Sequence, residues 1–263
     1  MHRLDKALSK ANGHAIVGLS VYTFDPIFVE IIAGLGFGAL WMEMEHGPLT
    51  FAEAGTLCRI ASGLGLLTMI RIPDARRENV LKAAEQDPDI LDVPMVNTLE
   101  IAAEFVRHAR YGPAGERGFF GISRAMRYGM VDSIREQQQR INDELCLMIQ
   151  VETAEAVGRT ADLCQTPGID GIFLGPGDLS TSLGVTGNTR HPKVLEAMEH
   201  TIRAAKAHGK RTAMACAPAD VPQWTQAGVD LLFCGGNIAC MRMGAAATLE
   251  KTRTPMPTPP KAG

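Results

Sequence analysis

The sequence predicts an α/β fold, a single-domain (β/α)8 (TIM) barrel. Short runs rich in Val, Ile, Leu and Met recur eight times, and most are continuously apolar, as expected for strands that are covered on both faces. Segments with helical spacing separate these runs, and no segment has the composition of a linker. Eight βα units within about 250 residues fit a closed barrel better than an open, doubly wound sheet.

The predicted strands and helices alternate along the chain. The strands are expected at 15–19, 38–44, 66–70, 90–94, 145–151, 171–175, 211–216 and 230–234. The helices are expected at 25–35, 50–63, 76–85, 98–109, 153–164, 192–208 and 221–227. We expect the barrel to occupy residues 1–252, and the Pro-rich residues 253–263 to form a mobile tail.

One insertion interrupts the alternation, between the fourth and fifth predicted strands. Residues 95–144 contain a helix, the turn-rich string YGPAGERGFFG and a polar helix at 132–142. We expect this insertion to lie above the barrel mouth or at a contact between subunits.

Composition limits the class of protein and its partners. The 263 residues are 46% hydrophobic, which is enough for one large core without disulfides. The formal net charge is −3 and no basic run occurs, so neither nucleic acid nor a membrane surface is an expected partner. We expect neither a spanning helix nor a signal peptide. The 6 cysteines show no CxxC or zinc spacing, which predicts free thiols in a reducing cytoplasm.

Polar and ionisable side chains follow the predicted strands at the points where the apolar runs end. In a (β/α)8 barrel, the carboxyl ends of the strands carry the active site, whereas solvated charges would favour the helices. The residues at these ends are Glu43, Glu45, His46, Arg71, Gln150, Glu152 and Asp178.

Two of these acids are candidate metal ligands. Glu152 closes an apolar strand, Gln150 shares its face by the period of two, and a carboxylate aimed into a barrel needs a counter-charge or a metal. Asp178 follows a Gly-Pro-Gly turn whose backbone N–H groups could cradle an anion. Two carboxylates without a nearby His or Cys suit Mg2+ or Mn2+, with Co2+ as a third candidate. The alternative is that both acids cap helices, Glu152 beside Thr153.

Arg71 and His46 are candidate catalytic residues. Arg71 ends the third predicted strand, where burying a guanidinium is costly unless it meets an anion or a polarised oxygen. His46 follows two glutamates and could move a proton, although a structural hydrogen-bonding role is the alternative. No lysine stands at a comparable strand end, which disfavours a Schiff-base mechanism.

Several strings together carry a resemblance to a known family. In chain order they are MEMEHGPLT, MIRIPD, DVPMVNTLEIA, RYGPAGERGFFG, MIQVETAEAV and GIFLGPGDLSTSLG. Over residues 15–240, the chain resembles the metal-dependent class II pyruvate aldolases of the HpcH/HpaI family. This family includes 4-hydroxy-2-oxoheptanedioate aldolase and 2-dehydro-3-deoxyglucarate aldolase.

The resemblance implies a reaction, a cofactor and an assembly. The reaction is cleavage of a 4-hydroxy-2-oxo acid to pyruvate and an aldehyde through a pyruvate enolate stabilised by a divalent metal. The assembly is a homo-hexamer, a dimer of trimers with an exchanged C-terminal helix. By this resemblance, Glu152 and Asp178 match the metal ligands, and Gln150 with the backbone of Gly177 and Asp178 matches the pyruvate site.

The resemblance also implies a catalytic set. Arg71 matches the arginine near the keto oxygen, His46 the catalytic histidine, and Glu85 the acid paired with that histidine. Glu43 and Glu85 stand where the family usually carries Asp. The sequence offers no route from Glu85 to His46, so a contact between subunits is the explanation left open.

The alternatives are two other enzymes that use the same enolate chemistry and one protein without catalytic activity. An acyl-CoA lyase or an oxaloacetate decarboxylase would use the same barrel and acid pair. We find no Lys/Arg cluster suited to an adenine phosphate, which disfavours the acyl-CoA lyase, whereas oxaloacetate decarboxylation stays open as a side activity. A catalytically silent barrel that binds a keto acid is a third possibility. Arg124 and Arg127 are candidates to meet the distal carboxylate of a dicarboxylic substrate, or else are solvated structural arginines.

Overall fold

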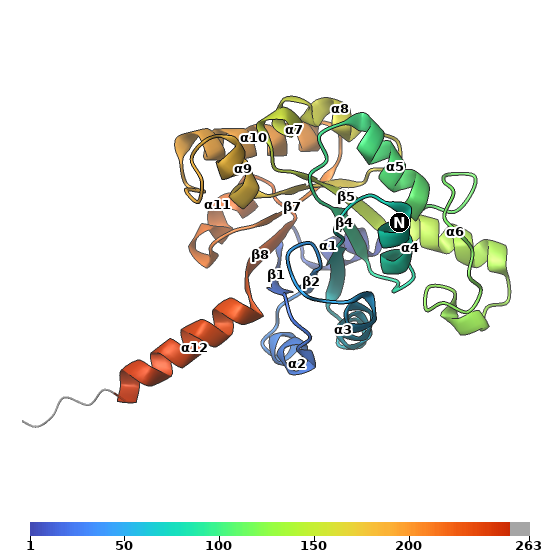
Figure 1. Ribbon diagram of the computed structural model, residues 1–263, viewed down its shortest axis with the longest axis horizontal. Helices are drawn as coiled ribbons and strands as arrows, with labels where there is room; N and C mark the ends of the chain where they lie inside the picture. Colours follow the sequence, from blue (N-terminus) through green and yellow to red (C-terminus); the bar gives the residue numbers. More distant parts are fainter. Residues whose placement is uncertain (253–263) are drawn as a thin grey trace, which may run out of the picture.

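The chain folds into a closed barrel of eight parallel strands with helices around it, as expected from the sequence (Figure 1). The computed structural model describes residues 1–252, so the tail expected at 253–263 lies outside the described residues. The strands are β1 (Ile16–Val21), β2 (Ala39–Glu43), β3 (Leu67–Arg71), β4 (Ile90–Val93), β5 (Cys146–Val151), β6 (Gly171–Leu174), β7 (Arg211–Ala215) and β8 (Leu231–Gly236). All eight coincide with the predicted runs to within two residues at each end.

Twelve α-helices and two short 3-10 helices complete the described part of the chain. The helices are α1 (Arg3–Lys10), α2 (Pro26–Gly34), α3 (Phe51–Gly63), α4 (Arg77–Ala84), α5 (Leu99–Ala109), α6 (Ile134–Glu144), α7 (Ala154–Gly158), α8 (Thr160–Gln165), α9 (Pro176–Ser182), α10 (Pro192–Ala207), α11 (Val221–Gln226) and α12 (Asn237–Thr252), with 3-10 helices at Arg127–Gly129 and Pro218–Asp220.

Local sequence signals explain where several helices begin. Thr50 and Glu53 form a reciprocal capping box at the start of α3. Asp25 accepts the Phe28 N–H ahead of α2, whose first residue is a proline. These caps satisfy backbone N–H groups that lack a partner within the helix.

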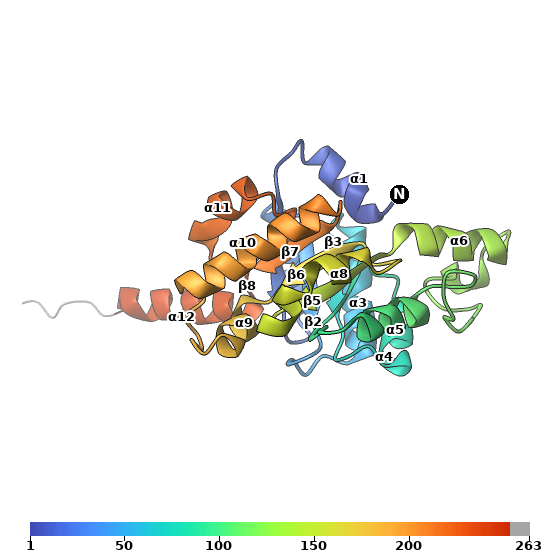
Figure 2. The same ribbon diagram turned by 90° about the horizontal axis from the view of Figure 1, so that it is seen from above.

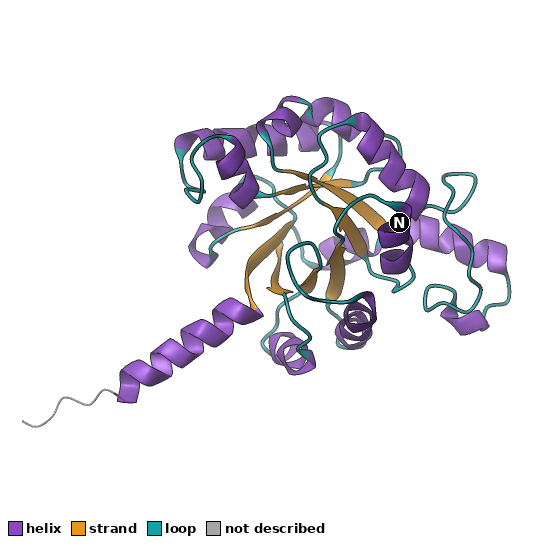
Figure 3. Cartoon of the chain, in the orientation of Figure 1, coloured by secondary structure: helices purple, strands orange, loops and turns teal. Residues whose placement is uncertain are grey.

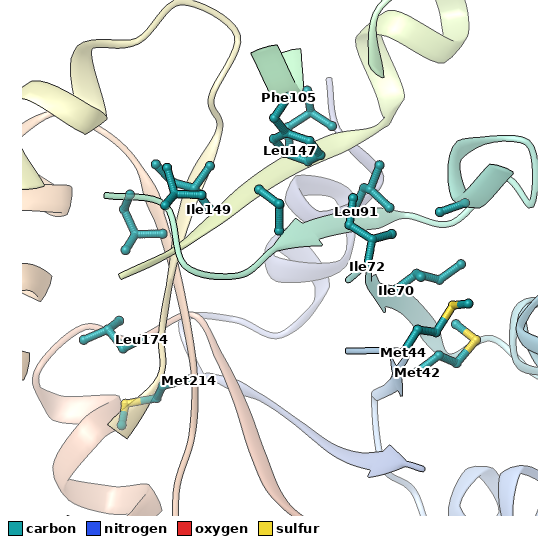
Figure 4. Packing of buried hydrophobic residues seen from close by; sticks show 14 of the residues in the cluster. Met42, Met44, Ile70, Ile72, Leu91, Phe105, Leu147, Ile149, Leu174 and Met214 are labelled. Carbon is teal, nitrogen blue, oxygen red and sulfur yellow. The ribbon is translucent and has the colours of Figure 1, made fainter. Parts of the chain in front are cut away.

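Alternation along the strands divides the interior into two cores. Outward side chains pack beneath the helices, and Figure 4 shows part of this layer, including Met42, Ile70 and Leu147. Inward side chains fill the barrel, where the Trp41 ring lies 5.0 Å from that of Phe173. The barrel is therefore a packed core rather than a pore, and only its ends are open to chemistry.

The amino end of the barrel is closed by α1, a helix that was not among those predicted. Its Leu4 is fully buried and joins the inward core, with Ala7 and Leu8 packed beside it. Two further helices differ from the predictions. The helix expected at 153–164 is split at Arg159 into α7 and α8, and α9 forms where only a turn was expected.

The insertion between β4 and β5 lies on the flank of the barrel rather than above its mouth (Figure 2). Glu144, the last residue of α6, pairs with Arg3 and Lys6 of α1, at the amino end of the barrel. Figure 3 shows that much of the segment between α5 and α6 is loop. The expectation that the insertion covers the mouth is wrong because these pairs hold it on the side.

The last helix, α12, leaves the barrel directly after β8 and points away from it (Figure 1). Asn237 at its start is its one buried residue among those described, whereas Ile238, Met241 and Met243 are exposed. No helix within residues 1–252 is long and apolar enough to cross a membrane.

Candidate active site

The carboxyl end of the barrel carries a layer of inward polar side chains directly above the apolar core. Glu43, Arg71, Asp92 and Gln150 occupy the last inward positions of β2, β3, β4 and β5. The strand register pairs Glu43 with Arg71 and Arg71 with Asp92. Glu43, Arg71 and Asp92 therefore lie at one level. Gln150 lies two residues beyond Met148, the strand partner of Asp92, and its side chain contacts Arg71.

Arg71 is held by two glutamates that follow one another on the same face. Its Nε and Nη2 atoms each lie 2.5 Å from Glu43 Oε2, and its Nη1 lies 3.0 Å from Glu45 Oε2. The guanidinium also lies 5.0 Å from the centre of the Trp41 ring. Although burial alone would lower it, the pKa of Arg71 is raised by Glu43 and Glu45, so the group stays charged.

Glu43 also shapes the turn that follows β2. Its second oxygen, Oε1, accepts the backbone N–H groups of Glu45 (2.7 Å) and His46 (3.0 Å). The Glu43 side chain is fully buried, with both oxygens in use. It therefore fixes the arginine and the histidine turn together, through one carboxylate.

Gln150 links the arginine to the glutamate after β5. Arg71 Nη1 donates to Gln150 Oε1 (3.3 Å), and Gln150 Nε2 donates to Glu152 Oε2 (2.6 Å). The other oxygen, Oε1, of Glu152 accepts the Met95 N–H at 2.7 Å. A Cβ added to Gly175 would lie 2.4 Å from Glu152 Oε2 and clash, so a glycine is required there.

Asp92 is a site residue that the sequence reading missed. Its side chain is fully buried, and neither carboxylate oxygen has a hydrogen-bond partner within residues 1–252. Burial raises its pKa well above the usual value, and the charge of Arg71 opposes this only in part. The available signal was its inward position one residue before the end of an apolar strand, the same signal that marked Gln150.

His46 and Asp178 stand at the open side of this layer. The His46 side chain is 64% exposed, and its Nε2 lies 3.6 Å from Glu45 Oε2. Asp178 lies in the first turn of α9 and is exposed, next to the equally exposed Gly177. The charge of Asp178 contributes to raising the pKa values of both Glu45 and Glu152, which places its carboxylate near theirs.

The residues present fit a divalent cation. Five carboxyl groups surround Arg71 and the mouth, namely those of Glu43, Glu45, Asp92, Glu152 and Asp178. Burial, together with Glu45 and Asp178, raises the pKa of Glu152 to about 7, despite the Met95 N–H and Arg71. A bound cation would offset this excess of negative charge and return Glu152 to its ionised form. All of these donors are oxygens, which favours a hard ion.

Three other predicted site residues lie away from the mouth of their own chain. Glu85 follows the last turn of α4, at the amino end of the barrel, and its Oε1 accepts from Arg117 at 3.1 Å. It cannot reach His46, which follows β2 at the opposite end. Arg124 bonds the Gln86 carbonyl and Ser62 Oγ on the flank, and Arg127 lies in the 3-10 helix of the insertion.

Comparisons with known proteins show which family this chain resembles. The HpcH/HpaI aldolase/citrate lyase family model matches residues 17–237. A hydroxypyruvate/pyruvate aldolase of Chromohalobacter salexigens is 34% identical over 224 residues, which cover 84% of this chain and 87% of the relative. A 2-keto-3-deoxy-L-rhamnonate aldolase of Escherichia coli is 32% identical, covering 80% and 78%. The crystal structure of an HpcH/HpaI aldolase from Desulfitobacterium hafniense superposes with a TM-score of 0.89 at 30% identity, covering 98% of this chain and all of that one.

Proposed function

Because the chain belongs to the HpcH/HpaI aldolase/citrate lyase family, we propose that it cleaves a 4-hydroxy-2-oxo acid into pyruvate and an aldehyde. The family and the aldolase class of enzyme, both predicted from the sequence, are confirmed by the family match and the two aldolase relatives. The observation that carries the proposed reaction is the connected set Glu43, Arg71, Gln150 and Glu152 at the barrel mouth.

Glu152 and Asp178 are the residues that would hold a divalent metal ion. We propose Mg2+ or Mn2+, with Co2+ as a third candidate, because the donors are carboxylate oxygens. When bound, the ion would polarise the substrate's carboxylate and keto oxygens as a Lewis acid. Gln150 and the backbone N–H groups of Gly177 and Asp178 are proposed to orient the pyruvate part of the substrate.

Arg71 stabilises the negative charge that develops on the keto oxygen as the bond between C3 and C4 breaks. Two glutamates hold its guanidinium in one orientation, so little reorganisation is needed during the reaction. Glu43 supports this role indirectly, because it fixes Arg71 and the turn that carries His46.

His46 takes the proton from the C4 hydroxyl group, either directly or through a water molecule. Its exposed ring stands at the entrance, where a substrate that reaches into the layer would present this hydroxyl. Asp92 lies below, and burial raises its pKa well above the usual value, which favours its protonated form and reduces the negative charge near the enolate.

A pyruvate-release assay tests the proposal. The full chain is incubated with several 4-hydroxy-2-oxo acids and Mg2+, Mn2+ or Co2+, and pyruvate is measured by coupled reduction. We expect turnover that EDTA abolishes and added metal restores, and that Glu152→Gln abolishes. Glu155→Gln, a change to an exposed acid on α7, is the matched control and should retain activity. Full activity after exhaustive chelation would contradict the proposed metal. Turnover of oxaloacetate with no turnover of any 4-hydroxy-2-oxo acid would contradict the proposed reaction.

We propose further that the chain assembles with copies of itself, as a hexamer. Exposed apolar side chains support this on two surfaces: Phe119, Phe120 and Ile122 on the insertion, and Met241 and Met243 on α12. Beside the first surface, a cavity of about 520 Å³ is lined by Glu85. Glu85 Oε2 is buried without a hydrogen-bond partner in residues 1–252. In this assembly, Glu85 acts on His46 of a neighbouring copy.

Mixing two inactive variants tests the shared site. If each site takes His46 from one copy and Glu85 from another, dissociating and reassembling His46→Ala with Glu85→Gln should restore activity that neither variant has alone. Light scattering of the unmodified chain should give the mass of a hexamer. A chain that is monomeric and fully active would contradict the proposed hexamer. A fully active Glu85→Gln variant would show that Glu85 has no part in the reaction.

A further inference from the structure

Two cysteines from neighbouring strands lie together on the outer side of the barrel. Cys216 directly follows β7, Cys234 lies in β8, and their sulfur atoms are 3.8 Å apart. The backbone fixes this pairing, because Ala215 and Phe233 are partners in the ladder and the Cys216 N–H donates to the Phe233 carbonyl (3.0 Å). The two side chains are therefore held side by side on one face of the sheet.

This pair differs from the other four cysteines. Cys58, Cys146 and Cys164 are buried, and Cys240 is exposed on α12. Both members of the pair are partly accessible. Cys216 also lines a cavity of about 380 Å³ between α10, β7 and α11, which gives a small polar reagent a way in.

The geometry allows a bond between the two sulfur atoms. Neighbouring strands hold Cα atoms about 4.8 Å apart, and disulfides accept Cα separations of about 4.4–6.8 Å. The sulfur atoms can therefore reach bonding distance, about 2.05 Å, by rotation of the side chains with little movement of the backbone.

The two thiols are hydrogen-bonded to each other, and either sulfur atom can be the donor. Loss of one thiol proton therefore leaves a thiolate that accepts a hydrogen bond from the other thiol. A thiolate is the nucleophilic form of cysteine, so the pair offers one sulfur for a first attack and a second sulfur beside it.

We propose that Cys216 and Cys234 are a reactive dithiol that hydrogen peroxide converts into an intrachain disulfide between β7 and β8. One thiolate of the pair attacks one peroxide oxygen, the O–O bond breaks, and hydroxide leaves, which gives a sulfenic acid on that sulfur. The thiolate of the other cysteine then attacks that sulfur, the S–O bond breaks and the disulfide forms. The dithiol loses two electrons, and the peroxide becomes two water molecules that take up the two thiol protons.

Peptide mapping of the full-length chain tests this directly. The reduced protein is treated with increasing hydrogen peroxide, its remaining thiols are alkylated, and the digest is analysed by mass spectrometry. We expect the number of free thiols to fall from 6 to four, a linked peptide pair containing Cys216 and Cys234, and full reversal by dithiothreitol. If Cys240 disulfides between chains form first while Cys216 and Cys234 are both still alkylated, the proposal is wrong.

Variants test whether the two cysteines act as a pair. Cys216→Ser and Cys234→Ser should each form no linked pair, and each should accumulate on the remaining member a sulfenic acid that dimedone traps. Cys240→Ser is the matched control and should form the Cys216–Cys234 link as the unmodified chain does. If neither single variant gives a dimedone adduct on the remaining member, the proposed sulfenic acid step is wrong. If a variant fails to fold, the peptide map of the unmodified chain tests the proposal by itself.

Discussion

The two ends of the barrel differ in how completely their acidic side chains are paired. At the amino end, the residue before each of β4, β6 and β8 is an aspartate that accepts the N–H of the second residue of the preceding strand. These bonds are Thr68 N–H to Asp89 (2.7 Å), Leu147 N–H to Asp170 (2.8 Å) and Thr212 N–H to Asp230 (2.7 Å). Each aspartate also pairs with a cation, from Arg3, Arg110 and Lys206 respectively.

The carboxyl end lacks this complete pairing. Glu43 has partners for both of its oxygens, but Asp92 has none for either within residues 1–252. Burial raises the pKa values of Glu45, Asp92 and Glu152. The amino end therefore contributes stability, whereas the carboxyl end holds unsatisfied charge that a substrate and a cation would complete.

Replacing one arginine at each end by lysine should give the largest difference in kcat between the two ends. Arg71→Lys should lower kcat by roughly 10²–10³-fold, because a point charge cannot reproduce the guanidinium geometry at the keto oxygen. Arg3→Lys, which alters an equally multivalent arginine at the amino end, should leave kcat within about twofold but lower the melting temperature. Steady-state pyruvate release and thermal scans on both variants check this. Equal losses of kcat would remove the functional distinction between the ends.

His46→Ala should have the next largest effect. We expect cleavage to fall by roughly 10²-fold while pyruvate still binds, since general-base assistance is typically worth that much. Because the side chain is 64% exposed, the melting temperature should change little. Inhibition by pyruvate and pre-steady-state cleavage rates are the measurements, with His200→Ala on the exposed side of α10 as control. Retained cleavage would place the proton acceptor elsewhere.

An aspartate at the amino end should matter for stability alone. Asp89→Ala removes the acceptor for the N–H and Oγ1 of Thr68 and one partner of Arg3, which should cost about 2 kcal/mol. Denaturant unfolding measures this loss, and kcat of the folded fraction should be unchanged. Asp162→Ala, on the exposed face of α8, should stay within about 0.5 kcal/mol. A kcat loss in Asp89→Ala would show that the amino end is coupled to the site.

The strands and most of the residues at the barrel mouth could be predicted because both are marked by a local pattern, a short apolar run that ends in a polar residue. Parallel strands that are covered on both faces are continuously apolar, so their runs stand out, and an inward polar residue at the end of such a run is conspicuous. Gln150 and Arg71 were found in this way. Asp92 follows the same rule, but its lack of partners depends on the register between β3, β4 and β5, which no local pattern contains.

Other features depended on contacts that are distant in sequence. The position of Glu85 at the amino end follows from the direction of α4, and the place of the insertion follows from pairs such as that of Glu144 with Arg3. The α9 helix has seven residues rich in Ser and Thr, which is too short and too polar for a periodic signal. The helix at 153–164 was predicted as continuous, although it breaks at Arg159. The signal for this break is a single glycine, Gly158 at the end of α7, and no proline accompanies it.

The smallest expected effect is a change in the pH dependence of stability at Asp92. Burial raises its native pKa above that of the unfolded chain, so between these two values the native state binds more protons than the unfolded state. Stability from this group is therefore lost as pH rises above about 4, where unfolded aspartate ionises. Asp92→Asn removes the titration, so the variant should gain stability relative to the unmodified chain as pH rises from 5 to 6. Urea unfolding at both pH values in EDTA measures the difference, with Asp162→Asn as the control at an exposed position. A difference that does not change with pH would mean that burial does not raise the pKa of Asp92 in the folded protein, and the contrast between the two ends would then not extend to this carboxyl group.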